Sequence, residues 1–183
     1  MPKTSIFSYL KLAYLSGPAN ERSLYRIIAK RQPRRIVEIG LGDASRSLRM
    51  FEAARRYCES AEIHYTGIDP FESRSGEGQT LKMKDAYRLF KQQGVQLKLV
   101  PGNALSAMTV IANGLANCDL IVIDAQISNQ QMQQAWRYFP RMMHGDTLVL
   151  RQTEADNGAQ FTELSLQEIE NLAQQAEQFA KAA

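Results

Sequence analysis

The length, composition and charge of the chain set the first limits on what it can be. With 183 residues, 44% of them hydrophobic and 22% charged, it is expected to form one globular domain with a proper core. A net charge of +3 is too small to argue for a nucleic-acid partner, and no apolar run is long enough to span a membrane. The first residues lack the apolar core of a signal peptide, and Cys58 and Cys118 match no metal-ligand spacing. We therefore expect a cytoplasmic protein with free, buried thiols.

Helix and strand patterns alternate along the chain, which favours a parallel sheet with helices on both faces. In chain order the patterns predict helix 5–15, helix 21–31, strand 35–39, a helix after a glycine-rich turn, strand 63–68, a Gly- and Ser-rich loop to about residue 80, helix 84–92, strand 96–100, helix 104–113, strand 120–123, helix 129–139, strand 147–150 and helix 165–181. Ser128 with Gln131, and Ser165 with Glu168, have the spacing of capping boxes. We expect five strands. Arginines cluster locally, and we expect most of them on solvated helix faces or in turns rather than in a phosphate-binding patch; the clusters are Arg31, Arg34 and Arg35, and Arg46, Arg49, Arg55 and Arg56.

The stretch from Glu38 to Ser45 is the most informative part of the sequence. The turn Gly40-Leu41-Gly42 follows the first predicted strand and leads into a helix. Glycine lets a ligand approach the backbone closely, and a helix start supplies N–H groups that have no partner within the helix. Glu38 is the unusual residue, because a carboxylate near the end of a central strand is costly unless it meets a donor or a cation. We therefore expect a ligand that carries positive charge.

Polar side chains also follow the next three predicted strands. Open parallel sheets bind ligands beyond the carboxyl ends of their strands, at the switch point, which places Asp69, Asn103 and Asp124 on one rim with the glycine turn. Asp69 could accept the hydroxyls of a ribose or be a solvated turn residue. Asn103 could pair with a purine edge, cap the following helix, or do both. Asp124 ends an apolar strand and could bind a cation, hold a metal or act as a base.

Together these stretches resemble the class I S-adenosylmethionine-dependent methyltransferases. The resemblance rests on Val37-Glu38-Ile39-Gly40-Leu41-Gly42, Gly67-Ile68-Asp69, Pro101-Gly102-Asn103-Ala104 and Asp119-Leu120-Ile121-Val122-Ile123-Asp124-Ala125. It implies a Rossmann-like, doubly wound α/β fold with about five mostly parallel strands in the order 3-2-1-4-5. It also implies S-adenosylmethionine as the cofactor. The chemistry agrees, because a sulfonium and an ammonium suit acidic residues at strand ends.

The resemblance assigns roles to the residues of the rim. The resemblance implies that Glu38 and the backbone at Gly40 and Gly42 hold the methionine part, that Asp69 takes the ribose hydroxyls, and that Asn103 and Ala104 border the adenine. Further implied cofactor contacts are Leu41, Ser45 and Pro70. Asp124 would face the methionine amino group or the substrate, and it is the candidate catalytic carboxylate. Gln126 and Arg151 are candidate substrate contacts, and the loop 72–82 and helix 5–15 would close the site.

Two further observations narrow the class of protein. The Ile123-Asp124-Ala125 stretch looks most like small-molecule O-methyltransferases of the catechol type, which bind a divalent metal through this Asp and an Asp-Asn pair after strand five. Arg151-Gln152 stands at that place here, and a guanidinium would repel a metal ion, so we expect no metal. The competing interpretation is a nicotinamide-binding module. Its fingerprint has glycine where this chain has Ser45, and an apolar residue where it has Glu38.

The C-terminal segment 152–183 departs from the pattern of the family. Two further strands usually follow strand five as an antiparallel hairpin, whereas this segment has the pattern of a loop and a helix. Strand five would then be an exposed edge, covered by the last helix or by a second subunit; terminal helices could also join a homodimer. We expect a single domain with a helical extension 1–20 and a cofactor-binding core 21–151. Two functions stay open: a methyltransferase for a small-molecule acceptor, or a cofactor-binding or scaffold protein without turnover.

Overall fold

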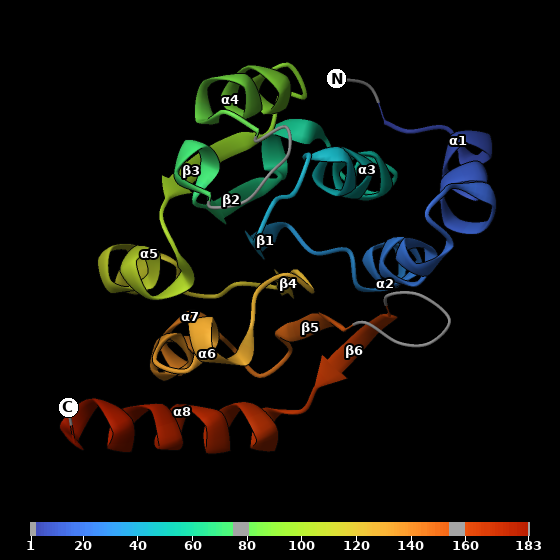
Figure 1. Ribbon diagram of the computed structural model, residues 1–183. Coiled ribbons are helices and arrows are strands. Elements are labelled where there is room, and N and C mark those ends of the chain that lie inside the picture. The colour runs from blue at the N-terminus through green and yellow to red at the C-terminus, as the bar shows by residue number, and fades with distance from the viewer. Residues whose placement is uncertain (1–2, 75–80, 154–159, 183) are drawn as a thin grey trace.

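The computed structural model describes residues 3–74, 81–153 and 160–182 as one sheet enclosed by helices (Figure 1). Within these residues the sheet has six strands: β1 (Arg35–Ile39), β2 (His64–Asp69), β3 (Gln96–Pro101), β4 (Leu120–Ile123), β5 (Leu148–Thr153) and β6 (Gln160–Leu164). Their order is β3-β2-β1-β4-β5-β6. All neighbours pair in parallel except β5 and β6, which are antiparallel. The switch point therefore lies between β1 and β4, beside the glycine turn.

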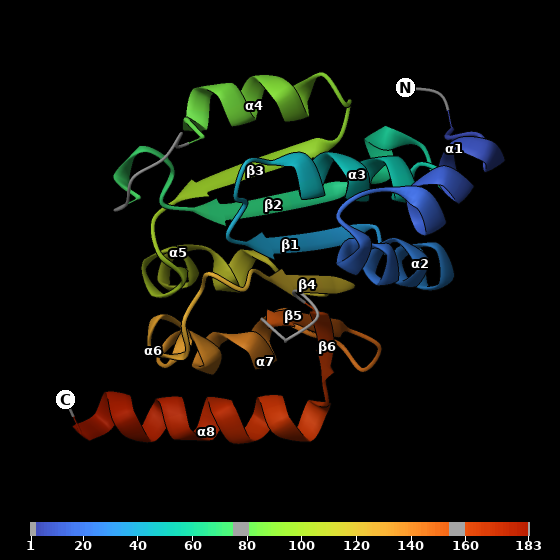
Figure 2. The same cartoon turned by 45° about the vertical axis from the view of Figure 1, so that its right-hand side comes forward.

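Helices cover both faces of this sheet (Figures 1 and 2). On one face lie η1 (Lys11–Leu15), which continues α1 (Ile6–Leu10), and α2 (Arg22–Arg31), α3 (Ser45–Ala54) and α4 (Met83–Lys91). On the other lie α5 (Ala104–Ile111), α6 (Asn129–Met132), α7 (Phe139–Met142) and α8 (Leu166–Ala182). Short 3-10 turns complete the described elements: η2 (Ala19–Glu21), η3 (Ser60–Glu62), η4 (Phe71–Ser73), η5 (Ala112–Gly114) and η6 (Ala135–Tyr138).

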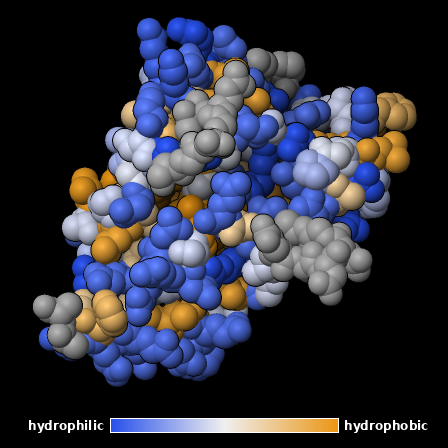
Figure 3. Space-filling view, in the orientation of Figure 1, coloured by the Kyte–Doolittle hydropathy of each residue, from blue (hydrophilic) through white to orange (hydrophobic). Residues whose placement is uncertain are grey.

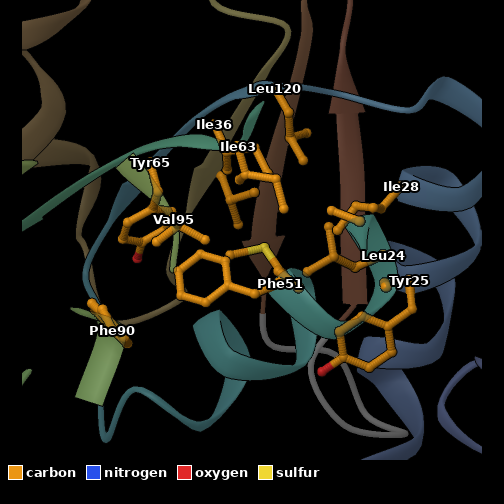
Figure 4. Close-up of a cluster of buried hydrophobic side chains, with 14 of the residues drawn as sticks. Leu24, Tyr25, Ile28, Ile36, Phe51, Ile63, Tyr65, Phe90, Val95 and Leu120 are labelled. Carbon is orange, nitrogen blue, oxygen red and sulfur yellow. The ribbon is translucent and has the colours of Figure 1, made fainter. Parts of the chain in front are cut away.

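The strands separate two hydrophobic cores because their side chains alternate between the faces. All four residues of β4 are buried, with Leu120 in one core and Ile121 in the other. The first core contains the aromatic rings of Phe51, Tyr65 and Phe90, which meet edge to face (Figure 4). The carboxyl ends of the strands are therefore held between two packed layers.

The structure confirms the predicted strand order and corrects the C-terminal segment. Strand five is longer than expected and is not an edge, because β6 pairs with it from Val149↔Leu164 to Thr153↔Gln160. The sequence of β6 hides this strand, since only Phe161 and Leu164 are partly buried against the two cores. A subunit contact through an exposed strand five loses its basis. The suggested contact through terminal helices stays a prediction.

The structure matches the predicted helix starts better than the predicted extent of helix 129–139. Both capping boxes form, with Ser128 accepting from the Gln131 N–H and Ser165 from the Glu168 N–H. The expected helix 129–139 is instead divided into α6, η6 and α7.

Hydrophobic residues are exposed over α1 and η1 (Figure 3). Within the described ranges, no helix is long and apolar enough to cross a bilayer.

Candidate functional site

The turn between β1 and α3 is packed on one side and open on the other. Gly40 has φ +84°, and a Cβ added there would lie 2.7 Å from the Asp124 Cβ, so the position requires glycine. At Gly42, with φ +60°, an added Cβ would meet no atom within 4 Å. Leu41 lies between them and donates its N–H to Asp69 Oδ2 at 2.8 Å. The turn thus joins the ends of β1, β2 and β4 and leaves space at Gly42.

Arg46, in the first turn of α3, lies at the centre of the rim. Its side chain is only 7% exposed. Nε donates to Glu38 Oε1, and Nη2 donates to the Gly40 carbonyl oxygen, both at 2.7 Å. Nη1 donates to Asp124 Oδ2 and to Gln152 Oε1, also at 2.7 Å each. One guanidinium therefore connects β1, the glycine turn, the end of β4 and β5.

Glu38 has all its partners inside the chain. Its side chain is fully buried, and Oε2 accepts hydrogen bonds from the Ser47 hydroxyl at 2.6 Å and from the Tyr65 hydroxyl. Burial, together with the neighbouring Glu38 carboxylate, raises the pKa of Tyr65, so the phenol stays protonated and donates. The cation expected beside Glu38 is present, but it is Arg46 rather than a ligand.

The expectation of a solvated Arg46 is wrong, and electrostatics explains the error. A positive charge in the first turn of a helix is unfavourable to the helix dipole, and burial lowers the pKa of a guanidinium. Here Glu38 and Asp124 outweigh burial and raise the pKa of Arg46 above its ordinary value. The sequence contains a signal for this ion pair, because the basic residue Arg46 at the helix start follows the strand carboxylate Glu38 by eight positions.

Asp69 organises the backbone at the end of β2. Its side chain is fully buried; Oδ1 accepts from the Phe71 N–H at 2.7 Å and Oδ2 from the Leu41 N–H. The Arg74 guanidinium forms an ion pair with Oδ2. Pro70 follows directly and begins the turn into η4. The solvated-turn interpretation of Asp69 is therefore wrong, whereas its predicted contact with a ribose stays a prediction.

Asn103 and Ala104 lie at the start of α5, beyond the end of β3. The Asn103 side chain accepts a hydrogen bond from the Ser106 N–H at 2.9 Å, which confirms the predicted helix cap. Ala104 is buried, and Gly102 donates its N–H to the Asp69 carbonyl at 3.0 Å. The starts of the segments after β2 and β3 are therefore tied together. The adenine contact of Asn103 and Ala104 stays a prediction.

Asp124 and the candidate substrate residues surround the segment after β4. The Asp124 side chain is 15% exposed, and its Oδ1 accepts from the Gln126 N–H at 2.9 Å. Arg151, on β5, donates to the Ile127 carbonyl at 3.1 Å. Gln126 is exposed. Each carboxylate oxygen of Asp124 thus accepts a hydrogen bond from within the chain, and its negative charge is balanced by Arg46.

The remaining predicted parts of the site are Ser45, helix 5–15 and the loop 72–82. Ser45 donates its N–H and hydroxyl to Asp43 at the start of α3. Thr4, just before α1, contacts the backbone of Glu52 and Arg55 near the C-terminal end of α3. Figure 2 places α1 at the opposite end of the sheet from the arrowheads of β1–β3, so helix 5–15 does not close this rim. Residues 75–80 of the expected closing loop lie outside the described residues.

A metal ion would need several ligand side chains at one place. Among the described residues, no three His, Cys, Asp or Glu side chains come together as a group that could hold a metal ion. The sequence does contain an Asp-Asn pair, Asp156-Asn157, several residues later than the place of the metal-binding pair in the catechol-type enzymes, and it lies outside the described residues. Asp124 Oδ2 forms an ion pair with Arg46.

Comparison with known proteins defines the fold. No family model and no curated protein matches the chain. It is similar to the O-methyltransferase TomG from Streptomyces achromogenes, solved in complex with SAM (16% identity, 99% of this chain and 81% of that chain, TM-score 0.56). It is also similar to a methyltransferase from Geobacter sulfurreducens (18%, 82% and 72%, 0.53) and to an O-methyltransferase from Bacillus cereus in complex with SAH (15%, 92% and 71%, 0.52). The chain therefore has the Rossmann-like fold of the class I methyltransferases.

Proposed function

We propose that the chain is an S-adenosylmethionine-dependent methyltransferase that acts on a small-molecule acceptor. The observation that carries this proposal is the convergence of two strand-end carboxylates on the glycine turn. Asp69 Oδ2 lies 2.8 Å from the Leu41 N–H, and Asp124 packs against Gly40. The fold supports the proposal, because TomG and the Bacillus cereus enzyme carry SAM and SAH on the same fold.

The residues at the turn offer the space and the acceptor groups that this cofactor would need. The backbone is open at Gly42, and the Gly40 carbonyl and Asp124 are acceptors that suit an ammonium group. Asp69 would hold the ribose hydroxyls, and Asn103 would border the adenine. When bound, S-adenosylmethionine supplies an electrophilic methyl group on a sulfonium. The chain's own task is then to orient the acceptor in line with that methyl group and to exclude water.

A second function has a specific observation in its favour. Asp124, the candidate base, is held in an ion pair with Arg46 and accepts from the Gln126 N–H, so its charge is already balanced within the chain. A protein that binds the cofactor without turnover would need no such base. The two functions share the cofactor and differ only in product formation.

Calorimetric titration with S-adenosylmethionine tests the cofactor. We expect binding by the wild-type protein and a loss of about 1–3 kcal/mol of binding free energy in Asp69→Ala, the scale of hydrogen bonds to a charged group. Asp85→Ala, at a half-exposed acid on α4, is the matched control and should bind as the wild type does. No heat at millimolar S-adenosylmethionine would reject both functions, and heat with a nicotinamide dinucleotide instead would favour the nicotinamide interpretation.

Product formation separates the two functions. The wild-type protein is incubated with S-adenosylmethionine and a panel of hydroxyl, amine and carboxyl acceptors, and release of S-adenosylhomocysteine is measured. Acceptor-dependent release supports the methyltransferase. Binding without release across the panel supports the protein without turnover.

A further inference from the structure

Arg46 is bound by this protein as a ligand cation would be. Its three nitrogens donate to four acceptors that come from separate parts of the chain: Glu38, Gly40, Asp124 and Gln152. Each of the four distances is 2.7 Å, and charge-assisted hydrogen bonds of this length are the strong ones. These acceptors form a cation subsite at the carboxyl edge of the sheet, and the chain fills it itself.

The same subsite includes the acceptors that suit the ammonium group of the proposed cofactor. The Gly40 carbonyl and Asp124 Oδ2 each receive a hydrogen bond from an Nη atom of Arg46. A guanidinium and a ligand ammonium cannot occupy the same space, so the two cations compete. The competition does not extend to Asp69, which has its own partners at the other side of the turn.

Burial indicates which contacts of Arg46 can open. Glu38 is fully buried and also holds Ser47 and Tyr65, so its pairing with Nε lies within the protein interior. The Asp124 side chain, which accepts from Nη1, is 15% exposed, so this end of the subsite lies nearer to solvent than the Glu38 end. A rotation that keeps Nε near Glu38 would release Gly40 and Asp124 while the fully buried Glu38 keeps its cation.

We propose that Arg46 is a built-in cation that closes the methionine end of the site. On this proposal, which rests on the proposed function for the identity of the competing ligand, S-adenosylmethionine enters only when Arg46 releases the Gly40 carbonyl and Asp124. An adenosine-based ligand without an ammonium group, such as 5′-methylthioadenosine, needs no such release. Arg46 thereby sets the affinity for the complete cofactor relative to its nucleoside part.

The cation subsite is first tested without the cofactor, by chemical rescue. Arg46→Ala removes the atoms that N-ethylguanidinium would restore. We expect N-ethylguanidinium to raise the unfolding midpoint of Arg46→Ala in proportion to its concentration, and neutral N-ethylurea to raise neither variant nor wild type. Arg88→Ala, which removes an exposed arginine, is the matched control and should show no rise. An equal response of both variants to N-ethylguanidinium would overturn the subsite.

Calorimetry then tests the competition. Arg46→Lys keeps a positive charge near Glu38 but has a single donor group, so it serves as a second variant if Arg46→Ala does not fold. We expect either variant to bind S-adenosylmethionine at least about tenfold more tightly than the wild type, the scale of releasing one hydrogen bond to a charged group. Affinity for 5′-methylthioadenosine should stay within about twofold of the wild-type value, well below the energy of one such bond.

The outcomes separate this inference from the proposed function. If wild-type and variant proteins bind S-adenosylmethionine equally, or if the variants bind it more weakly, the role of Arg46 is overturned while the cofactor stands. If neither protein binds S-adenosylmethionine or 5′-methylthioadenosine, the proposed function fails together with the competition. The rescue experiment then decides by itself whether Arg46 occupies a cation subsite.

Discussion

Two arginines pair with strand-end carboxylates on opposite sides of the glycine turn, and they differ in what they hold. Arg46 comes from α3, has a 7% exposed side chain and contacts two carboxylates. Arg74 comes from the segment after η4 and has a 28% exposed side chain; among the described residues, its ion-pair partner is Asp69. Asp69 also accepts two backbone N–H groups, so it does not depend on its arginine as Glu38 does.

We infer from this difference that Arg46 has a structural role that Arg74 lacks. Without Arg46, a buried Glu38 would keep only neutral donors, from Ser47 and Tyr65. Without Arg74, Asp69 would still hold the turn and the end of β2 together. Stability should therefore depend strongly on the first arginine and weakly on the second.

The largest effect is expected for Arg46→Met. Removing one partner of a buried ion pair leaves an uncompensated charge, so we expect the free energy of unfolding to fall by about 3–5 kcal/mol. Urea unfolding followed by circular dichroism measures it. The double variant Glu38→Gln/Arg46→Met removes the stranded charge and should recover much of the loss. A double variant as unstable as Arg46→Met would show that the guanidinium acts through packing instead.

A smaller effect is expected for Asp69→Asn. The neutral amide offers a single acceptor atom in place of two carboxylate oxygens, so the N–H groups of Leu41 and Phe71 cannot both keep their present partners. We expect a loss of about 1–3 kcal/mol in the same urea experiment. Asp85→Asn, at a half-exposed site, is the control and should change the free energy of unfolding by less than about 1 kcal/mol. An unchanged stability of Asp69→Asn would mean that Asp69 does not organise the turn.

The smallest effect is expected for Arg74→Ala. A partly exposed ion pair contributes little, because solvent competes for both charges, so the loss of unfolding free energy should stay within about 1 kcal/mol. Repeating the measurement at high salt should leave the difference between wild type and variant small. A loss as large as that of Arg46→Met would erase the contrast between the two arginines.

Much of the fold could be predicted from local patterns, and the rest depended on tertiary contacts. The β-branched run of β4 and the glycine turn after β1 indicated the central strands, and the strand-end rule brought Asp69, Asn103 and Asp124 to one rim. The sequence did not predict strand β6, because its half-buried residues, Phe161 and Leu164, follow no strict alternation. The burial of Arg46 was not predicted, because a cluster of arginines in a helix usually faces solvent. Its burial follows from carboxylates that the sheet brings within reach from positions up to 78 residues away.

A crystal structure of the wild-type protein with S-adenosylhomocysteine tests the central claim most directly. We expect the ligand's ammonium group to contact the Gly40 carbonyl and Asp124, with the Arg46 Nη atoms withdrawn from both and Nε still beside Glu38. A bound ligand whose ammonium group lies elsewhere, with Arg46 keeping all four of its contacts, would contradict the claim that Arg46 closes the methionine end of the site.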